Sequence, residues 1–144
     1  MKTIINKLSE KKKKWRSILL LPAILVTITF FAFTTKDICP EVNKCILTGD
    51  AQHLSKYFRS TVEMSVLGRE GYFSKIQAVS VLSEFFKNNP PRNFTVKQGG
   101  SNSENTRFSI GTYETSSGSL FKIYYVVKKE TESEFVHKLT IEKR

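Results

Sequence analysis

The stretch "GYFSKIQAVSVLSEFF", residues 71–86, decides the fold, because it predicts a long amphipathic helix that must cover an apolar surface formed elsewhere in the chain. Its start, Ser74-Lys75-Ile76-Gln77, fits the capping box S-x-x-Q. "NNPPRN" ends the helix, since a proline cannot continue the hydrogen-bond ladder. Apolar residues recur at helical spacing and form a wide stripe that comprises Ile76, Ala78, Val79, Val81, Leu82, Phe85 and Phe86.

After Pro91 the apolar period changes to two, which is typical of half-buried strands. We expect four strands, at residues 93–98, 107–115, 120–129 and 134–143, with residues 99–106 as a loop. Short polar connections make them an antiparallel meander. The residues expected to face inward are Phe108 and Ile110 in the second strand, Phe121, Ile123, Tyr125 and Val127 in the third, and Phe135, His137, Leu139 and Ile141 in the fourth.

Before residue 71 the pattern predicts a short helix pair and one further strand. Gly49 is placed to end the first helix and Asp50 to cap the second. Residues 61–66 alternate as a strand, and "LGREGYF" reads as a turn. The fold class is therefore α+β, with a curved antiparallel sheet of about five strands packed against a long helix and a short N-terminal helix pair.

The N-terminal third predicts three segments. Residues 1–16 are basic, residues 17–35 carry no charge, and residues 36–144 form one exported domain. A helix of nineteen residues spans about 28 Å, close to the hydrocarbon core of a membrane. We favour an uncleaved signal-anchor over a cleaved signal peptide, since no A-x-A pattern is present. The basic flank stays in the cytoplasm and the domain lies in the cell envelope, or is periplasmic or secreted if the segment is cut.

The charge distribution argues against a nucleic-acid partner. The chain has a net charge of +10, but residues 1–16 hold seven Lys and Arg against one Glu. A nucleic-acid binder would concentrate its basic groups on the folded domain. The partner that the sequence predicts first is the membrane, through residues 17–35.

The two cysteines predict neither a disulfide nor a metal site. In a helix opened by Pro40, Cys39 and Cys45 stand about 9 Å apart along the axis, beyond bridging distance. Two cysteines at this spacing make no zinc site. Cys45 shares the apolar stripe of its helix and is expected to be buried. We expect no metal and no cofactor.

Several short pieces together resemble a known family. They are Gly49-Asp50, the stretch from Phe58 to Met64, Ser74-x-x-Gln77, Phe85-Phe86…Pro90-Pro91 and Ile110-Gly111-x-x-x-Thr115. About residues 40–143 resemble small exported bacterial domains of unknown function within the nuclear transport factor 2-like superfamily. Where that family usually has a histidine before a glycine, this chain has Lys97-Gln98-Gly99. The resemblance implies a conical fold with a cavity between long helix and sheet, and no known activity.

Two hypotheses for function follow. The first is a non-catalytic, exported or membrane-anchored binding domain, whose ligand-pocket candidates are Phe85, Phe121, Tyr125 and His137. It would hold a small apolar ligand in the cone or a partner on the outer sheet surface near Lys122, Tyr124 and Lys128, with a homodimer through the sheet as the simplest case. The alternative is an isomerase-, dehydratase- or hydrolase-like enzyme using His137, with Tyr113 or Tyr125. No carboxylate is evident to orient that imidazole, so we name no catalytic residue.

Overall fold

The computed structural model describes residues 37–144 apart from 104 and 132. The predicted membrane segment, residues 17–35, lies outside the described residues, and no helix within them is long and apolar enough to cross a membrane. The helices are α2 (Cys39–Thr48), α3 (Ala51–Leu54), the 3-10 turn η1 (Ser55–Tyr57) and α4 (Lys75–Asn88). The strands are β1 (Phe58–Val66), β2 (Arg69–Ser74), β3 (Pro91–Ser103), β4 (Thr106–Thr115), β5 (Leu120–Glu130) and β6 (Ser133–Lys143).

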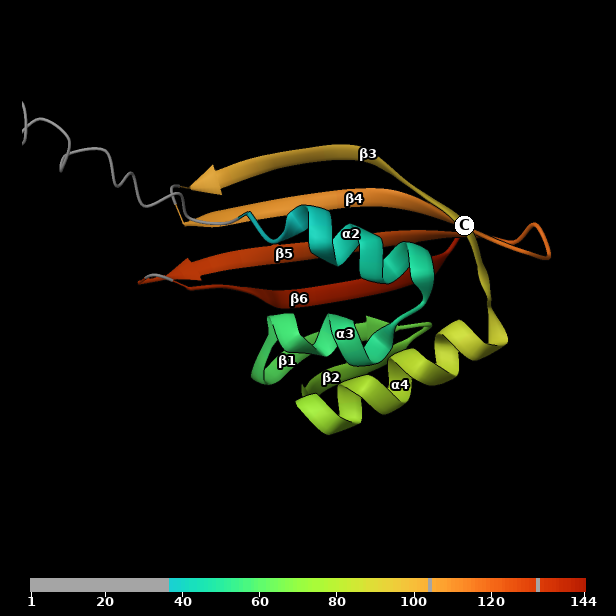
Figure 1. Cartoon of the computed structure of the whole chain (residues 1–144), viewed down its shortest axis with the longest axis horizontal. Helices are drawn as coiled ribbons and strands as arrows, with labels where there is room; N and C mark the ends of the chain where they lie inside the picture. The colour runs from blue at the N-terminus through green and yellow to red at the C-terminus, as the bar shows by residue number, and fades with distance from the viewer. Residues whose placement is uncertain (1–36, 104, 132) are drawn as a thin grey trace, which may run out of the picture. The chain divides into compact units, whose positions relative to one another are not determined.

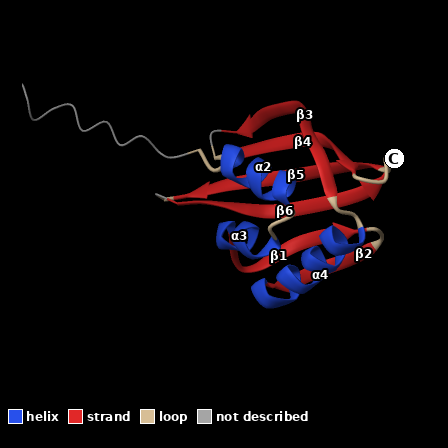
Figure 2. Cartoon of the chain, turned by 45° about the vertical axis from the view of Figure 1, so that its right-hand side comes forward, coloured by secondary structure: helices blue, strands red, loops and turns tan. Residues whose placement is uncertain are grey.

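The described strands form a six-stranded sheet in the order β2-β1-β6-β5-β4-β3. The first and last strands of the folded domain, β1 and β6, lie side by side within the sheet and run parallel; the other pairs are antiparallel. Figures 1 and 2 show the helices on one face of the sheet, with α4 along β1 and β2 and α2 toward β3. We call this the covered face and the opposite one the outer face.

The helix boundaries follow from short-range hydrogen bonds. The Ser74 hydroxyl accepts from the Gln77 N–H at 3.3 Å, and the Gln77 side chain accepts from the Ser74 N–H at 2.9 Å, so the predicted capping box of α4 is confirmed. Gly49 ends α2 at a φ of 67°, a left-handed conformation that favours glycine. The Asp50 carboxylate accepts from the His53 N–H at 2.8 Å and starts α3.

The core lies between the helices and the covered face of the sheet. From α4 it takes Ala78, Val81, Leu82, Phe85 and Phe86, whereas Ile76, expected on the same stripe, is 84% exposed in the first turn. Burial of this stripe against β1 and β2 is what makes α4 stable, because propensity alone rarely sustains a helix of this length. Aromatic rings fill the centre of the core. The centroid of the Phe85 ring lies 5.2 Å from that of Phe121 and 5.6 Å from that of Tyr113.

The sheet differs from the prediction in two ways. It contains an additional strand, β2, and its edge strand β3 is longer than expected. Residues 69–73, expected as part of a turn, form β2 together with Ser74 and pair with β1. Leu67 and Gly68, both with positive φ, make the tight turn that leaves room for this strand. β3 continues to Ser103 through the expected loop, with register shifts at three places. Such bulges bend the exposed edge of β3 and hinder its pairing with another chain.

The expected face is wrong in β4 and in the first part of β6, up to His137. In β4 it is Ser109, Gly111 and Tyr113 that face the core, while Phe108 and Ile110 lie on the outer face. In β6 a bulge at His137 changes the alternation, since Val127 pairs with Val136 and Val126 with Lys138. Val136 therefore takes the inward position expected for Phe135 and His137, and Leu139 and Ile141 keep theirs. For β5 the prediction is confirmed, because Phe121, Ile123, Tyr125 and Val127 are all buried.

Candidate functional site

The residues predicted to line a pocket occupy different surroundings. Phe85, Phe121 and Tyr125 belong to the packed core, with Tyr125 fully buried. Phe85 also borders a surface hollow of about 190 Å³ beside the β1–β2 turn. His137 is half-buried in the bulge of β6 and is not part of the core cluster. The structure thus joins Phe85 to Phe121 and places His137 apart from them.

A polar corner of the covered face lies beneath the start of α2. The Tyr125 hydroxyl donates to Asn43 Oδ1 at 2.7 Å, and burial raises the pKa of this phenol well above its usual value. Arg107 Nη2 lies 2.5 Å from Glu134 Oε2 and 3.0 Å from Asp37 Oδ1. The Ile38 N–H donates to the same Glu134 oxygen at 3.2 Å. This network holds the first described residues of the domain against β4 and β6.

Both cysteines are free thiols. Burial raises the pKa of Cys39 to about 11, and its hydrogen bond to Asp37 adds to the rise. The pKa of Cys45 is raised as well, again chiefly by burial. Because the thiolate is the reactive form, neither side chain is poised as a nucleophile. Among residues 37–144, the two gaps aside, no three His, Cys, Asp or Glu side chains are grouped as metal ligands.

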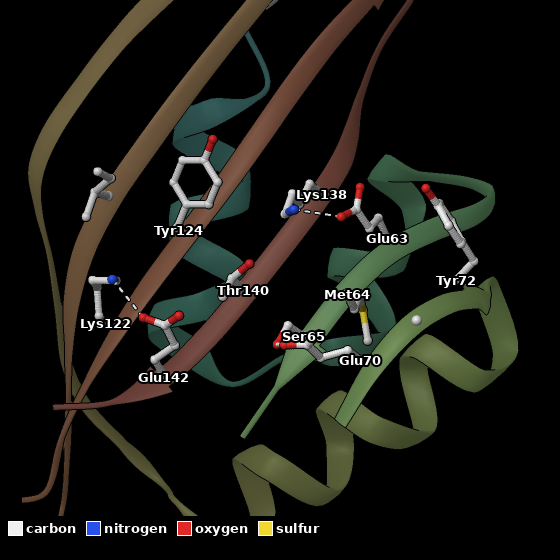
Figure 3. A pocket seen from close by; sticks show the side chains of 12 residues that line it. Glu63, Met64, Ser65, Glu70, Tyr72, Lys122, Tyr124, Lys138, Thr140 and Glu142 are labelled. Atoms are coloured by element: carbon white, nitrogen blue, oxygen red, sulfur yellow. Dashed lines mark hydrogen bonds and ion pairs between the residues drawn. The ribbon is translucent and has the colours of Figure 1, made fainter. Parts of the chain in front are cut away.

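An open groove of about 620 Å³ lies on the outer face and crosses five strands. Its floor is formed by small side chains, Ser65 on β1 and Thr140 on β6, which are neighbours in the register of the two strands. Larger side chains rise on either side, Tyr72 on β2 and Tyr124 on β5 (Figure 3). The hollow therefore results from small residues at the parallel junction between bulkier flanking strands. We call it the outer groove.

The strand register arranges the lining of the outer groove in cross-strand rows. Residues directly opposite one another in paired strands have adjacent side chains on one face. The first row contains Tyr72, Glu63 and Lys138; the second Glu70, Ser65, Thr140, Tyr124 and Ile110; the third Glu142 and Lys122. Phe108 lies beside the groove with its ring 6.4 Å from that of Tyr124 and supports that wall.

The charges in the outer groove are paired with one another. Lys138 Nζ lies 2.6 Å from Glu63 Oε1, and Lys122 Nζ lies 2.7 Å from Glu142 Oε2 (Figure 3). The hydrogen bond from Lys138 to Glu63 raises the pKa of the lysine above 10.5. Glu70 accepts from the Ser65 hydroxyl at 3.1 Å. The groove is consequently polar and almost neutral, with no lysine left without a carboxylate partner among its lining residues.

The sequence indicated the side chains of this surface but not the groove. Lys122 and Tyr124 were expected on the outer face, and they lie there, as does Lys128. Glu63 lies on the same face, and its carboxylate is half-buried against Lys138. Alternating polar residues in 61–66, 120–129 and 134–143 carry the signal. Only the pairing of β1 with β6, which are distant in the sequence, brings those polar faces together.

Comparison with known proteins gives the family and the fold. The family model for "Domain of unknown function (DUF4783)" matches residues 39–142. A DUF4783 family protein from Bacteroides ovatus is 30% identical, with a TM-score of 0.66 over 72% of this chain and 92% of that one. One from Bacteroides fragilis is 25% identical, with a TM-score of 0.67 over 75% of this chain and 100% of that one.

More distant structures share the fold alone. An NTF-2 like protein of unknown function from Silicibacter pomeroyi is 10% identical, with a TM-score of 0.56 over 74% of this chain and 90% of that one. No curated protein matches the chain. The chain belongs to the DUF4783 family of domains of unknown function, and its fold is that of the NTF2-like proteins.

Proposed function

We propose that the folded domain is a non-catalytic binding module whose ligand occupies the outer groove rather than the cone. The observation that carries this proposal is the contrast between the two faces. On the covered face Phe85, Phe121 and Tyr113 pack ring against ring. On the outer face a hollow of about 620 Å³ stays open, a volume within the range of small-molecule sites.

The enzymatic alternative finds less support in the geometry. A general base needs an orienting partner and a reacting atom within hydrogen-bond reach. His137 lies in a bulge, half-buried, and the hydroxyl of Tyr125 is engaged by Asn43. Tyr113 likewise donates to the Asn89 carbonyl at 2.6 Å, and burial raises the pKa of this phenol too. These groups stabilise the fold in their present contacts.

The test is a map of amide chemical-shift changes by NMR. The labelled protein is titrated separately with neutral oligosaccharides, with short peptides and with phospholipid micelles. We expect one of these three classes of ligand to change the chemical shifts of amides around the groove, near Ser65, Tyr72, Tyr124 and Thr140. Shifts confined to the covered face, around Asn43, Ser109 and Tyr125, would instead support the cone as the binding site.

Membrane anchoring through residues 17–35 is part of the same proposal. The apolar length and basic flank of that segment support it. Intact-mass measurement of the protein extracted from membranes is the direct check. Retention of the anchor gives the full chain of 16.5 kDa, whereas a chain that starts near residue 36 shows cleavage.

A further inference from the structure

We infer that the outer groove binds an uncharged oligosaccharide. The inference rests on the proposed function and adds the chemical class of the ligand. Its first support is charge. The groove contains two lysines and three glutamates, and both lysines are already within 2.7 Å of a carboxylate. A phosphate or carboxylate ligand would have to break these pairs, and an uncharged ligand does not.

The second support is the hydrogen-bonding capacity left in the groove. Each lysine ammonium has three donors and each carboxylate two acceptor oxygens, so one ion pair leaves most of them free. The hydroxyls of Thr140, Tyr72 and Tyr124 can both donate and accept. A ligand covered with hydroxyl groups, which also donate and accept, satisfies such a mixed surface without any net charge.

The third support is the pair of tyrosines. The Tyr72 side chain is 76% exposed, and an aromatic ring left in water is a natural contact for an apolar surface. Sugar rings offer such surfaces, because their C–H faces are apolar while their edges carry hydroxyls. The strands of Tyr72 and Tyr124 are three places apart in the sheet, about 14 Å. That span suits several linked sugar units.

A protein partner, including a second copy of this chain, fits the groove less well. The centres of protein interfaces are depleted in Lys and Glu and rich in apolar and aromatic contacts. Here five of the twelve lining residues are Lys or Glu, and they surround the floor formed by Ser65 and Thr140. Burying these half-exposed ion pairs under a protein would cost desolvation that their mutual attraction offsets poorly.

Calorimetric titration of the full chain tests the inference. The protein is kept in a detergent without a sugar headgroup and titrated with maltohexaose, cellohexaose, chitohexaose and, as an anionic counterpart, a galacturonic acid hexamer. We expect at least one neutral hexamer to bind, with a dissociation constant that changes less than about twofold between low and high salt. Tyr72→Ala and Tyr124→Ala should each weaken binding about tenfold or more.

Two further variants separate a lost contact from a damaged fold. Thr140→Trp leaves both tyrosines in place but fills the floor of the groove with a large side chain. It should therefore abolish binding while the protein keeps its melting temperature. Ile76→Ala removes a side chain that lies outside the groove and is about as exposed as that of Tyr72. It should leave binding unchanged.

Three results would overturn the inference. They are no heat with any neutral hexamer at millimolar concentration, binding of the acidic hexamer alone, or neutral binding that Tyr72→Ala, Tyr124→Ala and Thr140→Trp leave intact. A self-association that Thr140→Trp abolishes would also overturn the ligand class, yet it would retain the groove as the binding surface. Binding that Tyr125→Phe removes while the melting temperature is kept, and that Tyr72→Ala, Tyr124→Ala and Thr140→Trp leave intact, would overturn the proposed function itself.

Discussion

Lys138 Nζ lies 2.6 Å from Glu63 Oε1, and this contact joins β6 to β1 at the junction where the two strands run parallel. The pair stands between Tyr72 and Tyr124 in the outer groove (Figure 3). It therefore ties the C-terminal strand to the first strand and neutralises the middle of the proposed binding surface.

The pair predicts a specific pH dependence. The hydrogen bond to Glu63 raises the pKa of Lys138 above 10.5, so its stabilising effect is complete below that pH and is lost as the pH rises through the raised value. Glu63→Gln should return the pKa of Lys138 toward 10.5, which carbon-detected NMR of the lysine side chain measures. An unchanged pKa in this variant would show that the contact is absent in solution.

The ion pair between Arg107 and Glu134 is expected to contribute to the stability of the fold. Its partner Glu134 has a side chain only 9% exposed, so removal of the guanidinium leaves a carboxylate with little access to water. Arg107→Met should lower the free energy of unfolding by about 1–2 kcal/mol in urea titrations, since Arg107 itself is partly exposed.

The matched control for Arg107 is Arg92→Met. The Arg92–Glu114 contact is longer, 3.3 Å, and more exposed, so its loss should cost less than about 0.5 kcal/mol. Equal costs for the two variants would contradict the role given to the Arg107 network.

Gly111 lies so close to the Phe94 ring that any added side chain should create a packing defect. A Cβ at this position would lie 2.4 Å from the Phe94 ring, and the Thr95 carbonyl is also close at 3.0 Å. Gly111→Ala should therefore destabilise the protein by about 1–3 kcal/mol in thermal or urea unfolding. Gly99→Ala, whose added Cβ meets nothing closer than 3.5 Å, should cost clearly less. A similar cost at both sites would rule out the close approach of Phe94.

We expect both cysteines to react slowly with thiol reagents in the native state. Burial raises the pKa of Cys39 to about 11 and also raises that of Cys45. At pH 8 a thiol reagent should modify both many times more slowly in the native protein than in urea, because little thiolate is present. Native labelling as fast as in urea would contradict the burial of these side chains.

Local signals predicted the helices well, and long-range pairing accounts for the errors. Ser74 with Gln77, Gly49 and Asp50 each act within a few residues, so their roles could be inferred without knowing the tertiary structure. Residues 69–73 look like a turn because Gly71 interrupts them, and their pairing with β1 makes them a strand. For this reason the described part of the chain has six strands rather than about five.

The face of a strand is harder to predict when both faces carry apolar residues. In β4 the more hydrophobic Phe108 and Ile110 lie outward because Tyr113 packs against Phe85 in the core. Gly111 faces inward because Phe94 needs the space above it. In β6 the bulge at His137 shifts the alternation by one, and a single extra residue has no sequence signature here. The candidate groove depends on this register, so its side chains were predictable but their meeting was not.

The proposed ligand site lies on the outer face, while the covered face is a packed core. A crystal structure of the protein grown with the tightest-binding neutral hexamer shows which of the two faces holds the ligand. We expect sugar density in the outer groove, with rings against Tyr72 and Tyr124 and hydroxyls bonded to Thr140 or to the Lys138–Glu63 pair. Density between α2 and the sheet, beside Tyr125 and Asn43, would instead make the covered face the binding site.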